Sequence, residues 1–118
     1  MRTIGKIGAV SVVVLALGAS RIALGQPTEQ AVENAKTAKD HEAVAQSYDD
    51  EAKALRAKAT LHQNMARHYA GPSYSKSSGG STAMENHCKK LASGYADTAK
   101  DAEALAGDHR AMAKEAGK

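Results

Sequence analysis

Histidine and methionine recur three residues apart, which places the two side chains on the same face of a helix. The pairs are His62 with Met65 and His109 with Met112, and the chain has one cysteine, Cys88. Imidazole, thioether and thiolate form a soft ligand set that suits Cu(I), accepts Cu(II) where histidine dominates, and holds zinc through His and Cys. These residue types therefore indicate metal binding without catalysis, with copper as the first candidate and zinc as the second.

Two long helices must position these residues. Residues 28–69 and 82–116 are rich in Ala, Glu, Lys, Gln, Leu and Met, contain no proline, and show helical periodicity. Gly, Pro and Ser dominate the connection over residues 70–81, which we expect to be a flexible linker. Thr82 with Glu85 forms a capping-box pattern at the start of the second helix. We predict an all-α fold, an antiparallel two-helix hairpin.

The two predicted helices repeat each other. A shift of 47 residues aligns 45–66 with 92–113 and matches ten of 22 positions, which favours a duplicated helix. The matched residues are Ala45, Tyr48, Asp50, Ala52, Lys53, Ala57, Ala59, His62, Met65 and Ala66, which recur as Ala92, Tyr95, Asp97, Ala99, Lys100, Ala104, Ala106, His109, Met112 and Ala113.

A heptad lettered a to g, with His41 at position a, shows which faces the helices bury. Position e is alanine throughout: Ala45, Ala52, Ala59 and Ala66 in the first helix, and Ala92, Ala99, Ala106 and Ala113 in the second. Such a column permits close approach of antiparallel backbones, and we expect the larger a and d side chains to pack beside it. Position f is polar or small, which predicts a solvent face.

The helix limits place two residues level with each other when their numbers sum to about 150. His62 then lies level with Cys88, and His41 with His109. Two clusters result: His62, Met65 and Cys88, with His87 and Met84 nearby, and His109, Met112 and His41. We predict that a metal ion binds at one or both ends of the hairpin.

Packing alone is the alternative explanation of the same residues. Methionine at position d is ordinary core filler, and histidine near a helix end often serves as a polar cap. A duplication also copies core residues as faithfully as ligands. The alternative function is therefore a structural or protein-interaction helical protein, chaperone-like, of the cell envelope and without a metal. A redox-active thiol at Cys88 is a third, weaker hypothesis.

The N-terminus has the pattern of a signal peptide. Arg2 and Lys6 precede an apolar stretch over residues 7–17, and Ala23 and Gly25 are the small residues before Gln26. We expect residues 1–25 to be removed, leaving residues 26–118 as a periplasmic or secreted protein with no membrane segment. With one cysteine, the mature chain forms no internal disulfide.

The composition limits what a domain of this size can do. Residues 26–118 hold 13 basic and 13 acidic side chains, and with few aromatics this balance disfavours nucleic-acid binding. They contain 13 large apolar or tyrosine side chains, which make a thin core. We therefore expect a homodimer that completes a four-helix bundle. No catalytic arrangement, phosphate loop or haem-attachment motif stands out, so we do not expect an enzyme.

Overall fold

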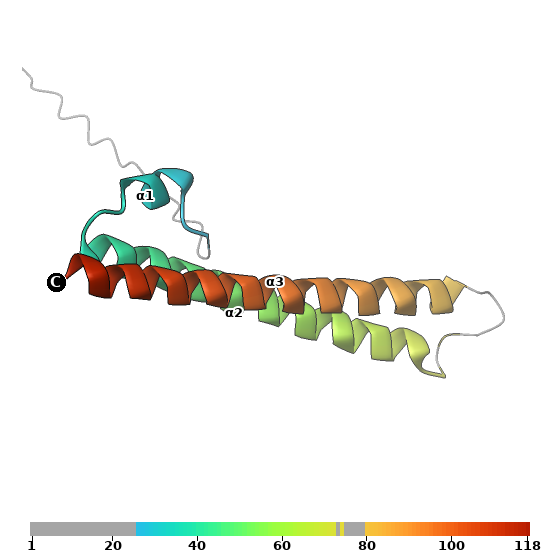
Figure 1. The fold of residues 1–118 in the computed structure, drawn as a ribbon. Helices are drawn as coiled ribbons and strands as arrows, with labels where there is room; N and C mark the ends of the chain where they lie inside the picture. Colours follow the sequence, from blue (N-terminus) through green and yellow to red (C-terminus); the bar gives the residue numbers. More distant parts are fainter. Residues whose placement is uncertain (1–25, 73, 75–79) are drawn as a thin grey trace, which may run out of the picture.

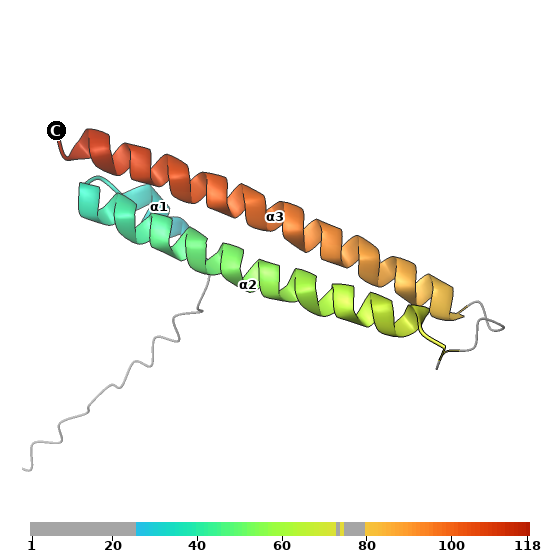
Figure 2. The same ribbon diagram turned by 90° about the horizontal axis from the view of Figure 1, so that it is seen from below.

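The predicted helical hairpin is confirmed. A computed structural model describes residues 26–72, 74 and 80–118. Its helices are α1 (Glu29–Asn34), α2 (Ala38–Ala70) and α3 (Gly80–Ala116), and the described residues include no strand. Helices α2 and α3 lie side by side and run in opposite directions along most of their length (Figures 1 and 2). The predicted signal peptide over 1–25 lies outside the described residues.

A capping box divides the helix that we expected over residues 28–69. The hydroxyl of Thr37 accepts a hydrogen bond from the Asp40 backbone N–H at 3.1 Å, and the Asp40 carboxylate accepts one from the Thr37 N–H at 2.9 Å. These bonds satisfy amide groups that have no partner within the helix, so α2 begins at Ala38. Thr28 caps α1 by a single bond, in which its hydroxyl accepts from the Ala31 N–H at 3.1 Å.

Acid is expected to weaken this cap. Hydrogen bonds from the Thr37 backbone and hydroxyl, and then from the Lys36 N–H, lower the pKa of Asp40 below its usual value. A carboxylate whose pKa is lower in the folded state stabilises the fold above its ordinary pKa, and this contribution is lost as the pH falls through the lowered value. We expect the first turn of α2 to fray below about pH 4, since free aspartate titrates near there. An NMR titration of its amides should show this, and Asp40→Asn should remove the dependence. Equal acid fraying in both proteins would contradict it.

The second long helix begins earlier than its predicted capping box. Helix α3 starts at Gly80, two residues before Thr82. The Glu85 carboxylate instead forms an ion pair with Lys89 one turn further on. This i,i+4 pair supports the helix from within rather than at its end.

Alanine fills most of the seam between α2 and α3, as the heptad pattern predicts, although Ala59 and Ala92 at position e are only half-buried. Ala45, Ala99 and Ala106 are completely buried, and Ala52, Ala66 and Ala113 nearly so. At the centre, Ala52, Ala99 and Ala102 form a core cluster flanked by Tyr48 and Leu55. The predicted solvent face at position f is exposed on both helices. The chain thus holds its long helices together largely through small side chains at close approach.

Position d of α3 departs from the expectation that it packs beside the seam. Leu91, Leu105 and Met112 are 45, 42 and 48% exposed, and Met84 is 45% exposed. The physical reason is that two helices in contact over alanine bury only positions a and e. A side chain at d would need a further layer of structure to cover it.

Short helix α1 provides that layer at one place. It lies across the start of α2, where Ala31 and Asn34 adjoin Ala43 and Val44 (Figure 1). Val44, at position d, is accordingly only 3% exposed. None of the described helices is both long enough and apolar enough to cross a bilayer.

The duplication is visible as a pseudo-twofold relation between the long helices. His109 stacks on Tyr48 with ring centroids 5.8 Å apart, and His62 stacks on Tyr95 at 5.5 Å. Each member of the second pair differs by 47 residues from its counterpart in the first. Arg56 and Glu103, themselves 47 residues apart, form a two-pronged ion pair, with both bonds at 2.7 Å. The pseudo-twofold axis therefore passes through this ion pair.

Candidate metal centre

The end of the hairpin near the C-terminus brings His41 and His109 together. His41 Nδ1 lies 3.1 Å from His109 Nδ1, a hydrogen bond in which one ring donates and the other accepts. His109 is 7% exposed, His41 is half-buried, and the Tyr48 ring stacks on the His109 ring. The predicted register, which sets His41 level with His109, thus agrees with the structure for these two imidazoles.

The opposite end carries the counterpart of this pair with one substitution. In the repeat, Cys88 occupies the position equivalent to His41, and His62 occupies the position equivalent to His109. Cys88 is a free thiol and 6% exposed. His62 Nδ1 is buried and forms no hydrogen bond with any described residue. His109 Nδ1 therefore has an imidazole partner, whereas the equivalent atom, His62 Nδ1, has none.

The methionines of the predicted clusters lie at the surface or beside it. Met112 and Met84 are exposed, Met65 is half-buried and His87 is exposed. Across the described ranges, no three His, Cys, Asp or Glu side chains converge in an arrangement able to hold a metal ion. Of the six predicted ligands, the structure therefore brings His41 and His109 into contact. At the other end, His62 and Cys88 are the corresponding pair by the repeat, and His62 Nδ1 forms no hydrogen bond to Cys88. We call these two pairs the two-residue cores.

Ion pairs join the helices on the side opposite α1, which the sequence reasoning missed. Arg110 bonds the Asp49 carboxylate and lies 3.9 Å from that of Glu42. The side-chain hydrogen bond from Arg56 lowers the pKa of Glu103. The repeat could have indicated the Arg56–Glu103 ion pair, because these two residues occupy equivalent positions and carry opposite charges.

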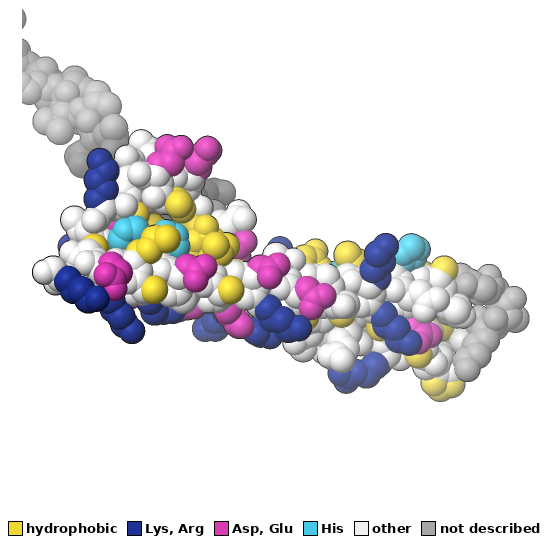
Figure 3. All heavy atoms as spheres, viewed as in Figure 1, with side chains coloured by type: hydrophobic (Ala, Val, Ile, Leu, Met, Phe, Trp, Pro, Cys, Tyr) yellow, Lys and Arg dark blue, Asp and Glu magenta, His cyan; other side chains and the backbone are white. Residues whose placement is uncertain are grey.

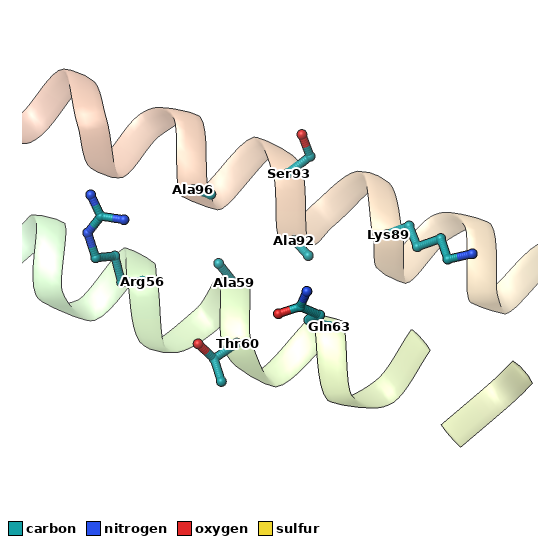
Figure 4. A pocket seen from close by; sticks show the side chains of 8 residues that line it. All are labelled: Arg56, Ala59, Thr60, Gln63, Lys89, Ala92, Ser93 and Ala96. Atoms are coloured by element: carbon teal, nitrogen blue, oxygen red, sulfur yellow. The ribbon is translucent and has the colours of Figure 1, made fainter. Parts of the chain in front are cut away.

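In the half of the hairpin near the linker, a shallow groove lies where the equivalent of the Asp49–Arg110 ion pair would be. The repeat equivalents of Asp49 and Arg110 are Ala96 and Gln63, and both line the groove (Figure 4). Its remaining walls are Ala59, Ala92, Thr60, Ser93, Arg56 and Lys89. Arg56 and Lys89 already pair with Glu103 and Glu85. Thr60 and Ser93 have no general base among the lining residues, so the groove offers no catalytic arrangement.

Rings at the linker end form a separate cluster. His68 contacts the rings of Tyr69 and Tyr74, with centroids 6.1 and 5.1 Å away. His68 is exposed, as expected for a residue near a helix end, and it takes no part in either two-residue core. This makes it a suitable control position for experiments on the other histidines.

Comparison with protein-family models, with curated proteins and with solved structures finds no match to this chain.

Proposed function

We propose that this chain is an exported, non-catalytic helical protein that binds a soft transition metal ion, copper before zinc, at the ends of its hairpin. The observation that carries the proposal is the approach of His41 Nδ1 and His109 Nδ1 to 3.1 Å. The export component rests on the signal-peptide pattern over residues 1–25.

The separation of the two nitrogens suits a shared metal ion. Metal–nitrogen bonds of about 2.0–2.1 Å at a tetrahedral angle hold two nitrogens about 3.3 Å apart. The rings of His41 and His109 would need to separate by only a few tenths of an ångström to accept an ion. Met112 projects from the helix one turn beyond His109, and its flexible thioether can turn toward a metal.

The opposite end favours the softer oxidation state. Cys88 supplies sulfur where His41 supplies nitrogen, and the buried Nδ1 of His62 is free to take a ligand. Thiolate and thioether ligands select Cu(I), whereas imidazole alone accepts several divalent ions. The two ends are therefore expected to differ in metal preference, with Cu(I) preferred at the cysteine end.

A competition titration tests the proposal. The purified protein is titrated with Cu(I), Cu(II) and Zn(II) in the presence of a chromophoric chelator, together with the double variant His62→Ala/His109→Ala. The wild type should bind Cu(I) stoichiometrically, and the double variant should lose this binding. His68→Ala is the matched control, since it removes an exposed histidine outside both cores. Equal affinity in the double variant and the control would refute the site.

A second function, in which the hairpin serves as an interaction protein of the cell envelope, is favoured by a different observation. Leu91, Leu105, Met84 and Met112 are exposed on α3 at multiples of seven residues, a pattern typical of a helix that packs against another chain. If the protein is helical but binds none of the three metal ions in the titration, this second function is the one that remains. The same exposure and the alanine core support the homodimer, which we propose as the assembled state.

A further inference from the structure

Short helix α1 marks a place where the hairpin accepts another helix. Beneath it lie Asp40, Ala43, Val44 and Ser47 of α2. These residues occupy positions g, c and d of the heptad, on the opposite side of the seam from the Arg110 and Arg56 ion pairs at position b. We call this side the α1 face, defined by positions d and g of both long helices.

The duplication provides a second seat of the same kind on α3. Adding 47 to the four residues beneath α1 gives His87, Lys90, Leu91 and Gly94, and all four line one groove together with Tyr95 and Thr98. The two sites differ in whether another element covers them. Val44 beneath α1 is 3% exposed, whereas its equivalent Leu91 is 45% exposed.

Other large apolar side chains lie on the same face. Leu61, the most exposed of them at 56%, is at position g of α2, in the column of Asp40 and Ser47. Figure 3 shows hydrophobic side chains along the edge of the hairpin on which α1 lies. On the α1 face, helix α1 therefore covers the seat around Val44, whereas Leu105 and Met112 of α3 at the same end stay exposed, as do Leu61, Met84 and Leu91 at the open end near the linker.

Charge divides the α1 face in the same way. Its α1 end carries Glu29 and Glu33 of α1, Asp40 and Glu51 of α2, and Asp101, Asp108 and Glu115 of α3. Among the described d and g positions at that end there is no Lys or Arg. The open end carries Lys58, His68 and His87, with Lys90 at its border, and its described d and g positions hold no Asp or Glu. A face that is acidic at one end and basic at the other complements itself when two copies are stacked in opposite directions.

We propose that a second copy of this chain packs on the α1 face in the opposite direction, so that the acidic α1 end of each copy covers the Leu91 groove of the other. The proposal rests on the homodimer proposed above and adds its surface and orientation. It gives the groove an acidic partner, Glu29 and Glu33 of α1, opposite His87 and Lys90. It also covers the exposed apolar side chains that the alanine seam leaves outside.

Analytical ultracentrifugation of the purified protein tests the surface. The wild type should sediment as a dimer, and Leu91→Glu should raise the dimer Kd at least about tenfold, because a charge then replaces a central apolar contact. Circular dichroism should show unchanged helicity. Ser93→Glu, two residues away at position f, is the matched control and should remain dimeric. A monomeric wild type would overturn both the dimer and this surface. A dimer that survives Leu91→Glu would overturn the surface alone.

A charge exchange tests the orientation. Lys90→Glu and Glu33→Lys should each weaken the dimer, and the chain carrying both changes should recover its affinity, because each copy then presents reversed charges to the other. Lys100→Glu at position f makes the same charge change away from the α1 face and should have no effect. Failure of the double variant to recover any affinity would overturn the antiparallel orientation.

Discussion

Replacing Ala106 by leucine is expected to lower the free energy of unfolding by about 1–3 kcal/mol, because a larger side chain overpacks the seam. Ala106 is completely buried, in a column where alanine allows α2 and α3 to approach closely. Leucine must either separate the helices or adopt a strained rotamer. Chemical denaturation followed by circular dichroism measures the loss.

The neighbouring residue supplies the control for this substitution. Beyond the backbone of its own turn of helix, nothing lies within 4 Å of where a methyl group on Gly107 would be, so Gly107→Ala adds that group without a clash. This change should raise stability by up to about 1 kcal/mol, since alanine is the better helix former. Equal and small effects of Ala106→Leu and Gly107→Ala would show that the seam is looser than its burial indicates.

Metal binding is expected to have the second large effect. A ligand that binds only the folded state, present at a hundred times its Kd, stabilises that state by about 2.7 kcal/mol. We therefore expect Cu(I) to raise the thermal midpoint of the wild type by several degrees. The His62→Ala/His109→Ala variant should melt at the same temperature with and without the ion.

His68→Ala separates specific ligation from incidental binding to histidine. Its thermal midpoint should rise with Cu(I) as the wild type's does, because His68 lies among Tyr69 and Tyr74, away from both cores. A shift that falls in proportion to the number of histidines, whichever ones are removed, would count against two defined sites. The same measurement with Cys88→Ser reports on the cysteine end alone.

The pattern of the sequence predicts the hairpin and one of its contacts because both follow from periodicity. Alanine at every e position indicates the seam, and the helix limits are enough to bring His41 level with His109. The division of the first helix at Thr37 could also have been foreseen. Thr37 and Asp40 have the spacing of a capping box, as Thr82 and Glu85 do, and helical periodicity alone cannot choose between a continuous and a restarted helix.

Other features depend on packing that the sequence pattern does not encode. Apolar residues at position d predict burial, yet only Val44 is fully buried, Met65 is half-buried, and the d residues of α3 are exposed. The reason is that α1 reaches one end of the hairpin and no described element covers Leu91. The narrow contact between the two helices also explains why only some of the six predicted ligands meet. His41 and His109 meet at the seam, whereas Met112 projects beyond it, since a residue three positions on lies on the flank of a contact this narrow.

X-ray absorption spectroscopy of the Cu(I)-loaded protein tests the central claim most directly, because it identifies the atoms bound to the metal. We predict imidazole nitrogen in the first coordination shell, together with sulfur that decreases in Cys88→Ser, and no imidazole signal in His62→Ala/His109→Ala. A first shell without imidazole, or a spectrum unchanged in the double variant, would contradict metal binding at the ends of the hairpin.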